Sequence, residues 1–129
     1  MKQIDFEELL EIARKTVYPK RLSDYVEVGG VAAAILTQSG NVYTGVCIDT
    51  ACSMGFCAEH AAAAAMITAR EQRIIKLVAV NWEGNPIPPC GRCREFLSQL
   101  DEKNGLAEVM VRDGVIVTLE ELLPYDWKK

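Results

Sequence analysis

The N-terminal part of the chain shows an amphipathic pattern. Apolar residues recur at roughly helical spacing from residue 3 to residue 18, with charged residues between them, and Pro19 ends the pattern. We therefore predict a helix over residues 3–18 whose apolar stripe packs against another element of the fold.

Two runs of apolar or β-branched residues follow, Val31–Thr37 and Asn41–Ile48, joined by a polar turn with a glycine. This arrangement predicts a β-hairpin. The next segment, 56–73, has no glycine or proline and includes five consecutive alanines, so it predicts a second helix. The apolar run Ile74–Trp82 ends at a Gly-Asn-Pro turn and suits a buried strand.

The last third of the chain contains both kinds of element. It predicts a helix over Gly91–Leu100, strands over Ala107–Arg112 and Val115–Leu119, and a short final helix over Leu119–Leu123. Thr118 and Glu121 have the spacing of a capping box for that final helix. The resulting order, α-ββ-α-β-α-β-β-α, implies an α/β fold with a mixed sheet covered by helices on both faces.

Composition sets the size and class of the protein. The chain has 129 residues, of which half are hydrophobic and a quarter are charged, and this fits one globular domain over residues 1–129. Fourteen basic against eighteen acidic residues give a net charge of −4, and the longest basic runs are pairs. A phosphate backbone would find few clustered cations, so we expect no nucleic-acid partner.

The cellular setting also follows from the pattern. The N-terminus carries charges where a signal peptide needs an apolar stretch, and no run approaches the roughly eighteen apolar residues of a membrane span. We therefore expect no membrane partner and a cytoplasmic location. Five cysteines are an odd number, and in a reducing compartment closely spaced cysteines are more often metal ligands or catalysts than disulfide partners.

Three of the cysteines, Cys57, Cys90 and Cys93, lie at predicted helix starts. The free N–H groups and positive dipole end of a helix start favour the thiolate that a metal requires. Zinc would take these three sulfurs and keep one tetrahedral position for water, as in a catalytic site. Glu59, two residues after the first ligand, would exchange protons with that water.

Two other kinds of function stay open at this point. Cys90 and Cys93 have the spacing of a redox pair, which predicts a titratable disulfide and no bound metal. The second alternative is a binding protein that is stabilised by zinc and has lost catalysis, although the intact Glu59 argues against this interpretation.

The segment Val31–Arg94 resembles the cytidine deaminase family, and its closest likeness is to the blasticidin S deaminase branch. The motifs that carry the likeness are Thr44-Gly45-Val46, Cys57-Ala58-Glu59, Pro89-Cys90-Gly91-Arg92-Cys93-Arg94, and Glu121-Leu122-Leu123-Pro124 with the nearby Trp127. Arg92, between the two cysteines, favours that branch over typical cytidine deaminases, which usually have a small residue there.

The resemblance implies a three-layer α/β/α sandwich around a mixed sheet of about five strands, with one zinc ion per chain. It also implies a homotetramer whose active sites are completed by neighbouring subunits. The residues that match the family's zinc ligands and catalytic acid/base are Cys57, Cys90, Cys93 and Glu59. The backbone of Ala58 would meet the pyrimidine ring, and Tyr125 and Trp127 would form an aromatic C-terminal cover.

The substrate positions depart from the family pattern. Typical nucleoside deaminases bind the ribose hydroxyl with Asn and Glu two residues apart, and the matching residues here are Cys47 and Asp49. Asp49 can accept a hydrogen bond from a hydroxyl or an amine, whereas Cys47 cannot replace an amide. We expect hydrolytic deamination of a small cytosine-type molecule: cytidine, deoxycytidine, a modified cytosine nucleoside, or a nucleoside antibiotic such as blasticidin S.

Two further side chains are expected beside the metal-binding thiolates. His60 follows Glu59 where many tetrameric members of the family have an arginine, and Arg92 separates the two later cysteines. For His60, a place on the helix surface or in an interface is equally open. Cys52, in the substrate loop, is interpreted as a small buried residue.

Overall fold

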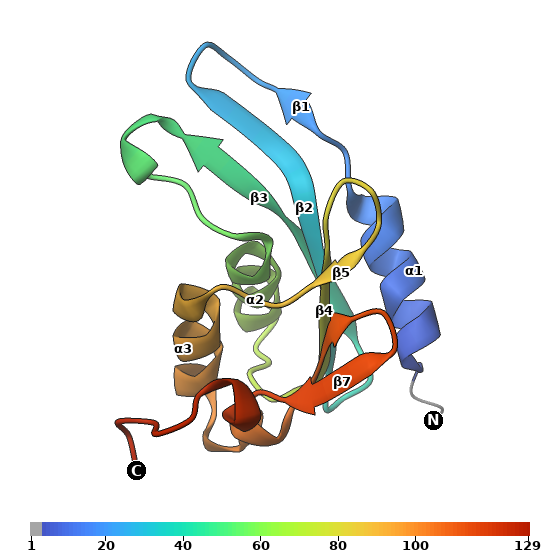
Figure 1. The fold of residues 1–129 in the computed structure, drawn as a ribbon, viewed down its shortest axis with the longest axis vertical. Coiled ribbons are helices and arrows are strands. Elements are labelled where there is room, and N and C mark those ends of the chain that lie inside the picture. Colours follow the sequence, from blue (N-terminus) through green and yellow to red (C-terminus); the bar gives the residue numbers. More distant parts are fainter. Residues whose placement is uncertain (1–3) are drawn as a thin grey trace.

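Residues 4–129 are described by a computed structural model (Figure 1). The helices are α1 (Phe6–Thr16), α2 (Ala58–Thr68) and α3 (Gly91–Leu100), and three short 3-10 turns lie at Ala51–Ser53, Glu102–Leu106 and Glu120–Leu122. The strands are β1 (Lys20–Arg21), β2 (Val26–Thr37), β3 (Val42–Thr50), β4 (Ile74–Val80), β5 (Pro86–Ile87), β6 (Glu108–Arg112) and β7 (Val115–Thr118).

All seven strands belong to one mixed sheet. β2 pairs antiparallel with both β3 and β4, β4 pairs parallel with β6, and β6 pairs antiparallel with β7. The short strands β1 and β5 pair with β2 and β4. The sheet therefore has seven strands instead of about five, because two-residue strands are too short to leave an alternating pattern in the sequence.

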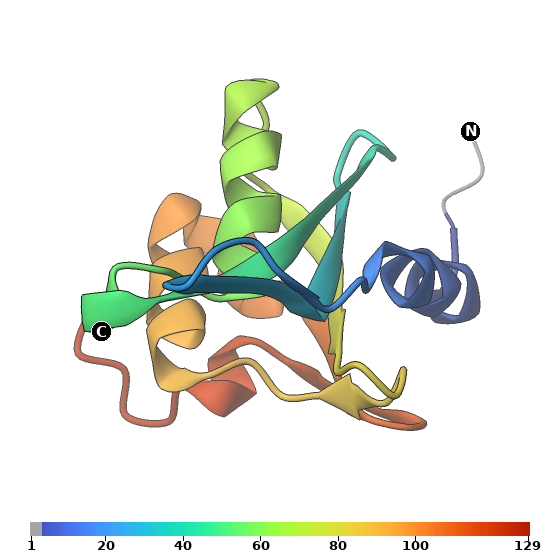
Figure 2. The ribbon, with the colours of Figure 1, turned by 90° about the horizontal axis from the view of Figure 1, so that it is seen from above.

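Helices cover both faces of this sheet (Figure 2), which confirms the predicted α/β/α layers. On one face, the stripe of α1 that includes Phe6 and Leu9 packs against β2 and β4. On the other face, α2 and α3 bury residues such as Met66 and Leu97 against the sheet. The two helices that start with the candidate ligands thus lie in the same layer.

The helix bounds differ from the prediction at several ends. α1 ends at Thr16 instead of residue 18, and residue 3 lies outside the described residues. α2 spans 58–68 instead of 56–73. It ends because Arg70 adopts a left-handed backbone (φ 71°) and the amide of Glu71 donates to the carbonyl of Met66. Glycine is the usual residue at such a helix end, and because the residue here is an arginine, the end of α2 could not be predicted from the sequence.

Two strands also differ from their predicted bounds. β2 begins at Val26 instead of Val31, and a register shift between Val28 and Ala32 accommodates the glycines that interrupt its pattern. β4 ends at Val80 instead of Trp82, because the side chain of Asn81 accepts hydrogen bonds from two following amides and forms a turn.

The predicted final helix over Leu119–Leu123 is instead one 3-10 turn, Glu120–Leu122. Its capping box forms as expected: the amide of Thr118 donates to the carboxylate of Glu121 at 2.9 Å, and the amide of Glu121 donates to Thr118 Oγ1 at 3.3 Å. The remaining predicted elements agree with the structure to within two residues at each end.

The alanine run of α2 allows this helix to lie very close to β3. A Cβ atom at Gly45 on β3 would be 2.4 Å from the backbone nitrogen of Ala62. Only glycine fits there, and the small residues of α2 permit the approach. The N-terminal half of α2 is therefore held close against the sheet.

Candidate metal centre and active site

The loop between β3 and α2 determines where Cys57 lies. Ile48 and Phe56 exchange two backbone hydrogen bonds of 3.0 Å, so the loop folds back onto the end of β3. The turn needs a glycine, because a Cβ atom at Gly55 would lie 1.8 Å from the carbonyl oxygen of Ile48. Cys57 follows at once and is the N-cap residue of α2.

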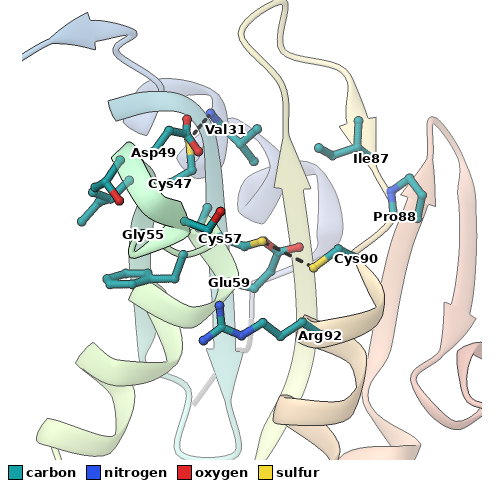
Figure 3. Close-up of a pocket in the computed structure, with 15 residues that line it drawn as sticks. Val31, Cys47, Asp49, Gly55, Cys57, Glu59, Ile87, Pro88, Cys90 and Arg92 are labelled. Atoms are coloured by element: carbon teal, nitrogen blue, oxygen red, sulfur yellow. Dashed lines mark hydrogen bonds between the residues drawn. The ribbon is translucent and has the colours of Figure 1, made fainter. Parts of the chain in front are cut away.

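The second pair of cysteines lies at the start of α3, with Cys90 as its N-cap residue and Cys93 in its first turn. Because α2 and α3 begin side by side, the three sulfurs meet, and Figure 3 shows two of them, those of Cys57 and Cys90. Cys90 Sγ is 3.4 Å from the sulfurs of both Cys57 and Cys93, and the three atoms all lie within 4.8 Å of one another.

These three sulfurs fit a zinc ion. A tetrahedral zinc with sulfurs about 2.3 Å away separates those sulfurs by about 3.8 Å, which is close to the 3.4 Å between Cys90 Sγ and each neighbour. A disulfide needs about 2.0 Å between its sulfurs, and all five cysteines are free thiols. Three sulfurs leave a tetrahedral ion one position for a ligand from outside the protein.

The pKa values of the thiols show why a cation belongs here. Burial raises the pKa of Cys57 to about 11 and also raises the pKa of Cys93. At Cys90, burial acts in the same direction, but hydrogen bonds from the Cys93 amide and the neighbouring thiols outweigh it and lower the pKa. The lowering expected at helix starts therefore occurs only at Cys90. A bound cation favours the thiolate form of all three.

Glu59 lies in the first turn of α2 and is 3% exposed. Its side chain lies beside the sulfurs of Cys57 and Cys90 (Figure 3). Burial raises the pKa of this carboxyl above its usual value. A carboxyl with a raised pKa, placed beside a metal position, is suited to accepting and donating protons there.

His60 lies behind the thiol cluster. Its Nδ1 atom is 3.3 Å from Cys93 Sγ, and its ring stacks on Phe96 with centroids 4.2 Å apart and planes 10° apart. Burial, with a smaller contribution from the charge of Arg92, lowers the pKa of His60 and favours the neutral ring. Arg92 itself is exposed and lines the cavity beside the thiols.

A cavity of about 540 Å³ opens in front of Glu59 and the thiols. The expected substrate-binding residues Cys47, Asp49 and Ala58 all line it. The Cys47 thiol accepts a hydrogen bond from the Val31 amide at 3.3 Å and lies 3.8 Å from Asp49 Oδ2. Cytosine-type rings and nucleosides are small enough for a cavity of this volume.

Three residues lie elsewhere. Tyr125 and Trp127 are exposed and do not line this cavity within one chain; the Trp127 indole donates to Glu95 at 3.1 Å. Cys52 was interpreted as buried, and this is wrong: it is exposed, in a left-handed backbone conformation (φ 60°). The loop that carries Cys52 lies on the surface of the protein, so the side chain is exposed even though cysteine is usually a buried residue.

Sequence reasoning missed other residues of the cavity wall, notably Phe56, Ile87 and Pro88. Phe56 directly precedes the first cysteine, so its position was a usable signal. Ile87 belongs to the two-residue strand β5, which is too short to show an alternating pattern in the sequence. Within residues 4–129, no helix has the length and apolar character needed to cross a bilayer.

Comparison with known proteins finds cytidine deaminases. A cytidine deaminase of Halalkalibacterium halodurans is 33% identical over 99 residues, which cover 73% of this chain and 74% of that protein. A cytidine deaminase of Mycobacterium tuberculosis is 35% identical over 96 residues, covering 73% and 69%. No protein-family model matches the chain.

Solved structures show the same fold along almost the whole chain. The crystal structure of cytidine deaminase from Mycobacterium tuberculosis has a TM-score of 0.80 and 26% identity, covering 97% of this chain and 98% of that one. The enzyme from Mycobacterium leprae has a TM-score of 0.78 and 24% identity, covering 95% and 99%, and supports the fold alone.

Proposed function

The chain belongs to the cytidine deaminase family, and on that premise we propose that it catalyses zinc-dependent hydrolytic deamination of a small cytosine-type nucleoside. One observation carries the proposal: three thiols that fit zinc converge within 4.8 Å, with the buried Glu59 carboxyl beside them. Cys57, Cys90 and Cys93 would hold the ion. Zinc, when bound, lowers the pKa of water so that hydroxide forms near neutral pH.

The remaining chemistry belongs to Glu59. It takes one proton from the attacking water and delivers it to ring N3. It then takes the remaining proton of the added hydroxyl group and gives it to the amine, so that the C4–N bond breaks, a C4=O bond forms and ammonia leaves. Its burial supports this role, because burial raises the pKa of the carboxyl and makes it a better proton acceptor than an exposed glutamate. The ring would lie against the backbone of Ala58, with Asp49 facing the sugar.

The substrate is proposed more finely as cytidine, deoxycytidine or a modified cytosine nucleoside. A blasticidin S-type antibiotic is the second candidate, favoured by Arg92 in the cavity wall and by Asp49 and Cys47 in place of a glutamate and an amide. A panel of these compounds, followed by ultraviolet absorbance and ammonia release, separates the candidates. A protein that binds one of them without releasing ammonia would instead be a zinc-stabilised binding protein.

We further propose one zinc-dependent domain over residues 1–129 that assembles as a homotetramer in the cytoplasm. The exposure of Tyr125 and Trp127 supports assembly, since exposed aromatic rings can pack against a neighbouring subunit. Five free thiols are typical of a reducing compartment. Light scattering of the purified protein measures the assembly state, and a monomer would refute it.

Glu59→Gln tests the proposed proton transfer. The amide keeps the shape of the side chain but cannot exchange protons, so kcat should fall by at least about 100-fold. Zinc content should stay at one ion per chain, measured by elemental analysis. Glu108→Gln, an exposed position on β6, is the matched control and should keep the parent rate. Ammonia release at the parent rate by the Glu59 variant would refute the assignment.

A further inference from the structure

Arg94 follows directly after Cys93 on α3 and connects two distant parts of the chain. Its Nε atom donates to the carbonyl oxygen of Pro89 at 2.8 Å, and its Nη1 atom donates to the carbonyl oxygen of Leu122 at 3.4 Å. The side chain is half-buried. One guanidinium thus joins the residue before Cys90 to the C-terminal 3-10 turn, whose Leu122 follows Arg94 by 28 residues.

The segment before Cys90 has few other means of attachment. Pro88 and Pro89 carry no amide N–H, so they cannot donate backbone hydrogen bonds. The strand that precedes them, β5, has only two residues. Cys90 caps α3 without a side-chain hydrogen bond to the helix. The Pro89 carbonyl is therefore an important point at which this segment can be held, and Arg94 binds it.

The C-terminal segment provides the fixed end of this connection. Glu95, the next residue on α3, accepts hydrogen bonds from the Trp127 indole and from Lys128 Nζ, each at 3.1 Å. Leu119, which leads into the C-terminal turn, is 1% exposed and belongs to the core. Neighbouring side chains of α3 thus hold the C-terminal segment against the helix that carries two of the thiols.

We propose that Arg94 is a positioning residue for the metal centre, which braces the Pro89–Cys93 turn against the C-terminal turn. It keeps Cys90 Sγ at the distance from Cys57 and Cys93 that one ion requires. The proposal rests on the zinc site of the proposed function. Arginine suits this task because its planar fork of donors reaches two carbonyl groups at once, whereas a lysine has a single ammonium group.

The test compares zinc affinity with the stability of the metal-free protein. Arg94→Gln should raise the zinc dissociation constant by at least about 10-fold, as losses of residues that orient metal ligands typically do. The constant is measured by competition with a chromogenic chelator, without substrate. The free energy of unfolding of the metal-free protein, measured in urea, should change no more than it does in the control variant. That control is Arg14→Gln, which removes an arginine whose Nε donates to the Gly84 carbonyl at 2.9 Å, far from α3 in sequence.

A second variant secures the test if Arg94→Gln does not fold. Arg94→Lys keeps the charge but offers one nitrogen in place of the two that bind the Pro89 and Leu122 carbonyls, so its zinc affinity should lie between those of the parent and the glutamine variant. If the folded variants bind zinc as tightly as the parent, the positioning role of Arg94 is overturned, while the proposed function is unaffected. A parent protein that bound no zinc would refute the proposed function together with this proposal, so the two failures are distinguishable.

Discussion

Cys47 and Asp49 lie two residues apart on β3, so their side chains share one face of the strand, and both line the cavity. Cys47 receives the Val31 amide and lies 3.8 Å from the Asp49 carboxylate. The thiol is therefore engaged by protein groups, and we propose that Asp49 is the group of this pair that contacts a substrate. This one carboxylate should carry much of the recognition of the part of the substrate beyond the ring.

At this residue, Asp49→Asn tests substrate recognition. A hydrogen bond to a charged group contributes about 1.5 kcal/mol or more, so KM should rise by about 10-fold or more while kcat changes little. Steady-state kinetics with cytidine measure both constants. Glu27→Gln is the matched control, because Glu27 pairs opposite Asp49 on β2 and lies outside the cavity wall. An unchanged KM in the Asp49 variant would contradict this role.

At the scale of elements, α3 was predicted residue for residue, since Pro88 and Pro89 open it and its apolar spacing is regular. The end of α2 was not predicted correctly, because Arg70 adopts the left-handed conformation that is usually found at a glycine. The convergence of the cysteines could be predicted because each group begins a helix after a strand. The brace from Arg94 could not, since it depends on a carbonyl 28 residues away.

The end of α2 is also joined to the turn of the β2–β3 hairpin. Glu71 accepts hydrogen bonds from the Tyr43 hydroxyl at 2.6 Å and from the Asn41 amide at 2.8 Å. The hydrogen bond from Tyr43 is the main cause that lowers the pKa of Glu71 to about 2. An unfolded glutamate has a pKa of about 4.3, so the ionised carboxylate stabilises the folded chain.

The sign of this effect gives a pH-dependent prediction. The stabilisation is fully present above pH 4.3 and is lost as the pH falls towards 2, because both states then bind the proton. Glu71→Gln should therefore be less stable than the parent at pH 7 by about 1 kcal/mol, allowing for solvent screening, and the difference should shrink below pH 4. Urea unfolding at pH 7 and pH 3 measures it. A difference in unfolding free energy of equal size at pH 7 and pH 3 would contradict a stabilising contribution from the ionised Glu71 carboxylate.

At the scale of the whole molecule, the layers explain why the site lies where it does. α2 and α3 occupy the same face of the sheet, and the glycine at position 45 brings α2 close to β3. Both helix starts then meet at one end of the cavity, whose other wall is β3. The layered fold and the thiol cluster could therefore be predicted from the sequence, because both follow from the order of the elements and the positions of the cysteines at helix starts.

The central claim is that one zinc ion is held by three sulfurs and has one position open. Zinc K-edge X-ray absorption of the purified protein measures this directly. We predict one zinc per chain with three sulfurs at about 2.3 Å and one oxygen or nitrogen at about 2.0 Å. A zinc ion with four sulfurs or with none, or an active deaminase free of metal, would contradict the account.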